Sequence, residues 1–277
     1  MRPEFLFVKK LILLSVLTNI VSFMHVTCAL AQQISQISSA GTRYWLYTPP
    51  GYDETSSYPM LVQLHGGGEI GDDLNELTTA TPHLLPSKLI QQGNWPSSRP
   101  FIVVSPQLKR DVSIPNYNDQ EWSPALVDEV IEHVKTNYNI DESRIYLTGI
   151  SLGGAGCWSY ATAYPHKVAA FVPISGKTNT NDACVVKDIP VWAFHGEADA
   201  LVNAQFSVDM INAIQACTPR GAYNPRLTLL PAKAHEGWSE VYNSTQGYAV
   251  FDWLLQFDKD ETTNKLPYVN AGADLRV

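Results

Sequence analysis

The stretch that decides the fold is Arg144-Ile145-Tyr146-Leu147-Thr148-Gly149-Ile150-Ser151-Leu152-Gly153. The apolar run at 144–148 predicts a strand and the residues after Ser151 suit a helix, so the G-x-S-x-G pentapeptide falls in a strand–turn–helix context. Glycine two positions either side of the serine lets strand and helix backbones pass closely. The context favours a nucleophile elbow, with Ser151 at the carboxyl edge of a sheet, over an ordinary turn.

An acid and a histidine follow two later strand signals. Asp199 lies in the loop after the apolar run at 190–194, and His235 lies just beyond the run at 226–230. The carboxyl ends of parallel strands meet at one edge of a sheet, so these side chains can converge on Ser151. We predict that His235 takes the Ser151 proton and that Asp199 orients the imidazole. Glu197 is the alternative acid, although it lies nearer the strand.

A glycine-rich motif after another strand signal predicts the oxyanion hole. The run at 58–64 reads as a strand, and His65-Gly66-Gly67-Gly68-Glu69 follows it. A loop of this kind donates one backbone N–H to the developing oxyanion, and the residue after the nucleophile donates the other. We assign Gly67 and Leu152, with Gly68 as the alternative loop donor.

Two further histidines, His65 and His195, stand at strand ends beside glycine. We expect both to orient loops rather than to take part in catalysis. A zinc site formed by His65, His195 and His235 is the alternative, but no H-x-x-x-H or clustered Cys/His spacing supports it. We therefore predict neither a metal nor another cofactor.

The residues around these motifs resemble a known group of enzymes. The run at 144–173 and the segments at 65–73 and 191–199 are similar to α/β-hydrolase esterases of the polyhydroxybutyrate-depolymerase-like or feruloyl-esterase-like group, some of them called predicted peptidases. The resemblance covers about residues 42–255. It implies an α/β-hydrolase fold and a Ser–Asp–His triad. It indicates the substrate only weakly, because the group mixes esterases of plant-wall acyl groups, polyesters and small esters.

The pattern of the whole chain agrees with an α/β fold in one domain. Strand signals lie near 43–47, 60–65, 101–105, 144–148, 169–174, 190–195 and 226–231, and helical patterns near 124–136, 152–164, 203–216 and 247–257. Continuous apolar strands with helices between them predict a mostly parallel sheet covered on both faces. We assign residues 32–260 to the catalytic domain. Residues 261–277 read as a linker or the start of an immunoglobulin-like domain, with a disordered tail as the alternative.

The first 31 residues read as a secretory signal peptide. Arg2, Lys9 and Lys10 precede an apolar run at 11–23 that is too short for a comfortable membrane span, and Ala29-Leu30-Ala31 offers small residues at the cleavage site. Lipidation at Cys28 is the alternative. Removing this segment takes away three basic residues and one acidic residue, which changes the formal net charge from −8 to −10. We therefore expect a secreted or periplasmic protein without a nucleic-acid or membrane partner; its oligomeric state is unknown.

Three cysteines remain after such processing, in a compartment that permits disulfides. Cys157 falls within the helix after Ser151, where a buried thiol is expected. We pair Cys184 with Cys217, which would clamp the two segments that flank the Asp199 loop.

The substrate hypothesis rests on segments expected at the rim of the site. We expect residues 74–99 and 109–122 to wrap that rim, and Trp122 and Trp238 to flank a shallow cleft and stack on an aromatic acyl group or a sugar; rim aromatics that only cover the core are the alternative. Our first hypothesis is a secreted serine carboxylester hydrolase acting on feruloyl or acetyl esters of plant polysaccharide. A polyester depolymerase is second and a peptidase third. The rival from another class, a non-catalytic polysaccharide-binding protein, is disfavoured by the intact triad.

Overall fold

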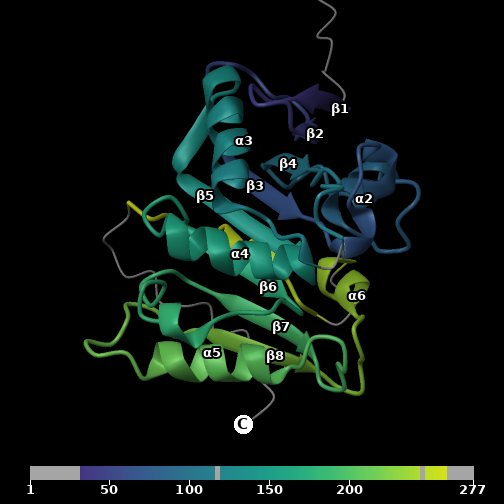
Figure 1. Ribbon diagram of the computed structural model, residues 1–277. Coiled ribbons are helices and arrows are strands. Elements are labelled where there is room, and N and C mark those ends of the chain that lie inside the picture. The colour runs from purple at the N-terminus through teal and green to yellow at the C-terminus, as the bar shows by residue number, and fades with distance from the viewer. Residues whose placement is uncertain (1–31, 116–118, 244–246, 261–277) are drawn as a thin grey trace, which may run out of the picture.

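The computed structural model describes residues 32–115, 119–243 and 247–260, so the predicted signal peptide and C-terminal linker lie outside the described residues (Figure 1). Eight strands form one sheet in the order β1-β2-β4-β3-β5-β6-β7-β8. Their bounds are β1 Gln32–Ile37, β2 Arg43–Thr48, β3 Tyr58–Leu64, β4 Ile102–Pro106, β5 Ile140–Ile150, β6 Ala170–Ile174, β7 Trp192–Gly196 and β8 Arg226–Leu230. Six neighbouring strands, β4, β3, β5, β6, β7 and β8 in their order across the sheet, pair in parallel. The strand β2 is antiparallel to β4, and β1 is antiparallel to β2.

Helices cover both faces of the sheet, as predicted. They are α2 Pro86–Gln91, α3 Pro124–Asn137, α4 Leu152–Ala163, α5 Gln205–Gln215, α6 Trp238–Asn243 and α7 Val250–Leu254, with short 3-10 helices at Gly67–Glu69, Leu74–Leu77 and Thr180–Asp182. Side chains of α3, α4 and α5 share one hydrophobic cluster with the face of the sheet toward the viewer in Figure 1, and those of α2, α6 and α7 share a second cluster with the other face. Within the described ranges, no helix has the length and apolar character needed to cross a membrane.

The sequence explains why β5 and α3 form where they do. Every residue from 145 to 150 on β5 is buried, because the strand lies in the middle of the sheet with helices on both sides. The buried face of α3 carries Val127, Val130, Ile131 and Val134, spaced as one stripe of a helix. The helix α3 lies where the sequence predicted it, and β5 contains the predicted strand at 144–148.

Some elements differ from the expectation. The edge strand β1 and the helices α2 and α6 were not predicted, and β5 begins at Ile140 rather than near 144. The sequence of β1, Gln-Gln-Ile-Ser-Gln-Ile, is mostly polar, and α2 and α6 each have six residues. Short or polar segments of this kind are stabilised by tertiary contacts, which a local pattern does not reveal.

The predicted disulfide is confirmed. Cys184 and Cys217 are bonded, with Cα atoms 5.6 Å apart. The bond joins the segment after β6 to the residues that follow α5. Cys157 is a free, buried thiol in α4, and burial raises its pKa.

Candidate active site

The turn between β5 and α4 is the predicted elbow. Ser151 has a left-handed φ of 52°, and a Cβ atom on Gly153 would lie 2.1 Å from the carbonyl oxygen of Leu64. A Cβ atom on Gly149 would lie 2.5 Å from the carbonyl oxygen of Gly153. No side chain fits at such distances, so both glycines are required for β3, β5 and α4 to meet here. The strained serine is positioned by the packing of three elements.

Ser151, His235 and Asp199 form one chain of hydrogen bonds. The Ser151 Oγ lies 2.8 Å from His235 Nε2, and His235 Nδ1 lies 2.6 Å from Asp199 Oδ2. With the Nδ1 proton directed to the carboxylate, Nε2 is free to accept the serine proton. The contacts predicted among these three residues are confirmed.

The backbone after β7 holds the Asp199 carboxylate in place. Its Oδ1 accepts hydrogen bonds from the N–H groups of Leu201 at 3.0 Å and Val202 at 2.9 Å. The Asp199 side chain is fully buried, whereas Glu197 is exposed and accepts a bond from the Ala232 N–H at 3.3 Å. The acid facing His235 is therefore Asp199, as predicted, and Glu197 is not.

The other two strand-end histidines brace loops. His195 Nε2 donates to the carbonyl of Val202 at 2.8 Å, and its Nδ1 accepts from Ser207 Oγ at 2.8 Å. His65 Nδ1 donates to the Gly66 carbonyl at 2.6 Å, and its Nε2 accepts from the Leu108 N–H at 2.9 Å. Burial lowers the pKa of His195 and lowers that of His65 to about 4, so both rings are neutral at pH 7. This is the loop-orienting role expected for them.

Gly67 and Leu152 each stand at the first position of a helix, the 3-10 helix Gly67–Glu69 and α4. The N–H group at such a position has no acceptor within its own helix. Both residues line the cleft that contains Ser151. This arrangement supports Gly67 rather than Gly68 as the loop donor, since Gly68 is not among the lining residues.

The loop that carries Gly67 is held by contacts that the sequence did not reveal. The buried Glu69 carboxylate accepts a hydrogen bond from Thr81 Oγ1 at 2.8 Å, and the Glu69 carbonyl accepts one from Gln107 Nε2 at 3.1 Å. Glu69 is the last residue of the His-Gly-Gly-Gly-Glu motif, and its position next to the glycines was the only sign in the sequence that it supports this loop. These contacts fix the loop that carries Gly67.

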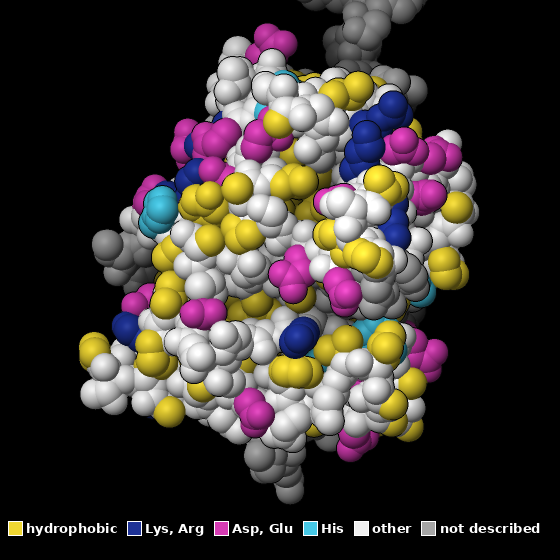
Figure 2. Space-filling view, viewed as in Figure 1, with side chains coloured by type: hydrophobic (Ala, Val, Ile, Leu, Met, Phe, Trp, Pro, Cys, Tyr) yellow, Lys and Arg dark blue, Asp and Glu magenta, His cyan; other side chains and the backbone are white. Residues whose placement is uncertain are grey.

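The Ser151 cleft has a volume of about 660 Å³. The hollow beside α4 in Figure 2 shows hydrophobic side chains at its floor, with acidic and basic side chains around it. Its lining is Gly67, Asp119, Gln120, Glu121, Trp122, Ser151, Leu152, Ala155, Gly156, Trp158, Ser159, Thr162, Lys177, Thr178, Asn179, Asp182, Leu201 and Val202. The cleft therefore combines an apolar floor with a polar, mixed-charge rim.

The structure gives the two expected substrate tryptophans different places. Trp122 lines the cleft but is only 2% exposed; its Nε1 donates to the His65 carbonyl at 3.1 Å. Trp238 is 6% exposed, is not among the lining residues, and packs edge-on against His235 with ring centroids 5.1 Å apart. Its Nε1 donates to Ser175 Oγ at 3.3 Å. The expectation that Trp238 flanks the cleft is wrong, because its ring is buried behind the histidine.

Residues 74–99 were also expected to form part of the cleft wall, and the structure corrects this. None of them lines the cleft. The buried apolar side chains of the segment include Leu74, Leu77, Leu85, Leu89 and Trp95, and the last three pack into the cluster on the α6 and α7 side of the sheet. The wall is formed instead by residues 119–122, as expected for that loop, and by the loops at 177–182 and 201–202.

Trp158 is a lining residue that sequence reasoning missed. It is 3% exposed, and its buried Nε1 has no hydrogen-bond partner within the described part of the chain. Its ring packs edge-on against Phe171 with centroids 5.0 Å apart. In sequence it is one more apolar residue of a buried helix, so nothing distinguished it.

Comparison with known proteins agrees with this geometry. A family profile described as Phospholipase/Carboxylesterase matches residues 111–248. A bifunctional acetylxylan esterase/xylanase of Neocallimastix patriciarum is 30% identical over 174 residues, which are 60% of this chain and 22% of that protein. A probable feruloyl esterase C of Aspergillus terreus is 27% identical over 173 residues, which are 62% of this chain and 60% of that protein. The chain thus spans less than two thirds of either relative.

Solved structures show the same fold. A thermostable esterase superposes with a TM-score of 0.63 at 25% identity, over 82% of this chain and 63% of that one. The feruloyl esterase module of Clostridium thermocellum, in complex with sinapinate, superposes with a TM-score of 0.57 at 19% identity, over 82% of this chain and 87% of that one.

Proposed function

We propose that this chain, which belongs to the α/β-hydrolases and within them to the feruloyl-esterase-like group, is a serine carboxylester hydrolase with Ser151 as its nucleophile. The observation that carries the proposal is the uninterrupted chain of hydrogen bonds from Ser151 through His235 to the buried Asp199, located in a cleft. A serine hydroxyl alone is a weak nucleophile, and this arrangement supplies the base that it needs.

The reaction follows from the positions of these groups. His235 Nε2 accepts the proton as Ser151 Oγ forms a bond to the acyl carbon, and the carbonyl oxygen becomes an oxyanion facing the N–H groups of Gly67 and Leu152. The carbon–alkoxide bond then breaks, and His235 gives the proton to the leaving alcohol. In the second half, His235 accepts a proton from a water molecule as the water oxygen bonds to the acyl carbon. The bond between the acyl carbon and Ser151 Oγ then breaks, and His235 returns the proton to Ser151. Asp199 keeps the ring oriented throughout.

The cleft has room for acyl groups from acetate up to an aromatic acid, and its rim suits a hydroxyl-rich leaving group. Leu152, Trp158 and Leu201 offer apolar surface, while Gln120, Lys177 and Asn179 offer polar contacts at the rim. Trp158 lines the cleft, and its buried Nε1 has no hydrogen-bond partner among the described residues; a small adjustment of the cleft would let it donate to an oxygen substituent on an aromatic acyl group. Because relatives include feruloyl and acetylxylan esterases, we propose feruloyl or acetyl esters of plant polysaccharide as substrates, met by a secreted enzyme.

A fluorophosphonate probe tests the nucleophile directly. The wild-type protein and a Ser159→Ala variant should label fully, whereas Ser151→Ala should not label. Ser159 is a matched control because it is an exposed serine that lines the same cleft. Labelling of Ser151→Ala would refute the proposal. Rates on methyl ferulate, acetylated xylan, short nitrophenyl esters and polyhydroxybutyrate films then rank the substrates; the highest kcat/KM on polyhydroxybutyrate would exclude the plant-ester proposal.

A further inference from the structure

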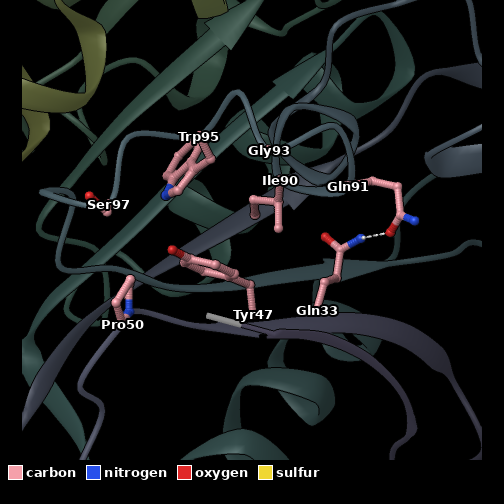
Figure 3. Close-up of a pocket in the computed structure, with 8 residues that line it drawn as sticks. All are labelled: Gln33, Tyr47, Pro50, Ile90, Gln91, Gly93, Trp95 and Ser97. Carbon is pink, nitrogen blue, oxygen red and sulfur yellow. Dashed lines mark hydrogen bonds between the residues drawn. The ribbon is translucent and has the colours of Figure 1, made fainter. Parts of the chain in front are cut away.

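A second cavity lies away from the Ser151 cleft, between β2, the amino-terminal edge strand β1 and α2. Its volume is about 300 Å³, and it is lined by Gln33, Tyr47, Pro50, Ile90, Gln91, Gly93, Trp95 and Ser97 (Figure 3). We call it the β2–α2 pocket. It shares no lining residue with the Ser151 cleft.

The topology places this pocket toward the opposite edge of the sheet from Ser151. Tyr47 on β2 stands opposite Val103, near the start of β4, and β2 runs antiparallel to β4. The end of β2, where Pro50 follows, therefore points to the amino ends of the parallel strands, whereas Ser151 follows the carboxyl end of β5. A ligand in the pocket does not compete with the ester bond for the cleft.

The chemistry of the lining selects a neutral, hydroxyl-rich ligand. None of the eight residues carries a charge, and together they offer two aromatic rings, two amides and hydroxyl groups. The rings of Tyr47 and Trp95 meet edge-on with centroids 6.4 Å apart. Aromatic carbon and neutral hydrogen-bonding groups complement the C–H and O–H groups of a sugar. The Arg99 guanidinium lies over the Trp95 ring, 4.5 Å from its centroid, but Arg99 does not line the pocket.

Trp95 provides an independent sign of a missing partner. It is 7% exposed, and its Nε1 is buried without a hydrogen-bond partner among the described residues. Figure 3 shows this nitrogen on the side of the indole that faces the space beside the Tyr47 hydroxyl. A buried donor without a partner is unfavourable, and a ligand oxygen would satisfy it after a small adjustment of the pocket.

The two glutamines form the other polar end of the pocket. Gln33 Nε2 donates to Gln91 Oε1 at 3.4 Å. In Figure 3 this contact turns the remaining oxygen of Gln33 toward Ile90 and the space above Tyr47. The amide pair thus joins β1 to α2 and places an acceptor beside the pocket.

We propose that the β2–α2 pocket is a non-catalytic binding site for a neutral sugar unit of a polysaccharide chain. The sugar assignment rests on the lining residues, and only its link to esterified polysaccharides rests on the proposed function. Such a site would hold a polymer on the enzyme and raise the local concentration of its ester groups at the cleft.

Binding is tested without turnover by titrating xylohexaose and, separately, cellohexaose into the Ser151→Ala protein and measuring heat. At least one hexasaccharide should bind at a single site. In that background, Gln33→Ala with Gln91→Ala, and separately Trp95→Phe, should each weaken binding about tenfold or more. Matched controls are Gln36→Ala on β1 and Gln92→Ala beside Gln91, neither of which lines the pocket; they should bind like the parent.

The titrations can contradict the proposed sugar site in two ways. No binding of either hexasaccharide, or binding that the glutamine and Trp95 variants leave unchanged, overturns the proposal. The glutamine variants keep the test valid if Trp95→Phe fails to fold, since both glutamines have partly solvated side chains. The same substitutions in the active protein should leave kcat/KM on nitrophenyl acetate unchanged and lower the rate on acetylated xylan. Failure of fluorophosphonate labelling would contradict the proposed function while leaving the binding result intact.

Discussion

The two cavities show two ways of forming a site on one sheet. At the carboxyl edge, the Ser151 cleft depends on backbone positions: a strained serine, two glycines without room for a Cβ atom, and N–H groups at helix starts. At the other edge, the β2–α2 pocket depends mainly on side chains, and none of its lining residues is charged. Reactive chemistry needs groups held in a fixed geometry, whereas recognition of a neutral ligand needs complementary surface. Substitutions should therefore affect the two sites separately.

The largest expected effect is that of Ser151→Ala. Turnover of nitrophenyl acetate should fall by at least about a thousandfold while the fold and hexasaccharide binding survive, because the nucleophile is lost and the pocket is untouched. Asp199→Asn should cost less, since the orienting acid carries the smaller share. Steady-state kinetics checks both variants. If Glu197→Gln proves more damaging than Asp199→Asn, the acid is misassigned.

Lowering the pH should lower the free energy of unfolding, because His65, which lies on the side of the cleft, is buried in its neutral form. Burial lowers the pKa of His65 to about 4 from an ordinary value of 6.5. Below pH 6.5 the unfolded chain binds a proton at His65 that the folded protein does not yet bind. The stability that the neutral, buried His65 contributes is therefore fully present above pH 6.5 and is lost as the pH falls toward 4. It amounts to about 3 kcal/mol of unfolding free energy.

Urea unfolding between pH 7 and pH 4 measures this loss. His65→Gln should start less stable and lose less over the interval, whereas the exposed His166→Gln should behave like the parent. A variant at His65 with an undiminished pH dependence would show that another group is responsible. Burial also lowers the pKa of His195, which adds loss in the same direction.

The disulfide should matter to the cleft and not to the pocket. Cys184 and Cys217 are separated by 33 residues, and the cleft wall at 177–182 ends just before Cys184. Replacing both by serine should lower the free energy of unfolding by about 3 kcal/mol and reduce kcat/KM on esters. Hexasaccharide affinity of the folded variant should be unchanged. Equal disturbance of both sites would contradict their independence.

Two tryptophans offer a smaller test within the cleft region. Trp238→Phe should reduce kcat/KM on methyl ferulate and nitrophenyl acetate alike, by about tenfold, because the ring supports His235 through packing and the Ser175 bond is lost. Trp158→Phe should reduce only the rate on methyl ferulate, by a few-fold, because it removes the donor proposed for the aromatic acyl group. The reverse pattern would restore Trp238 as the acyl-contacting residue.

Features that depend on neighbouring residues in the sequence were predicted correctly, whereas features that depend on contacts between distant segments were not. The elbow, the order of Ser151, Asp199 and His235, and the strands that carry them are local patterns, and all lie where predicted. Exposure is not a local property, so the sequence could not tell that Trp238 lies behind His235 or that residues 74–99 turn their apolar side chains into the core. The β2–α2 pocket likewise joins residues from three separate segments, one of them the unpredicted strand β1.

The most direct test of the central claim is to trap the acyl-enzyme. The protein is mixed with nitrophenyl acetate, quenched in acid during the first turnover, and analysed by intact mass and peptide mapping. The proposed mechanism predicts an acetyl group on Ser151 and none on Ser159, with no acetylated species in the Ser151→Ala variant. An active enzyme whose acetyl group maps to another residue, or that never carries one, would contradict the acyl-serine mechanism.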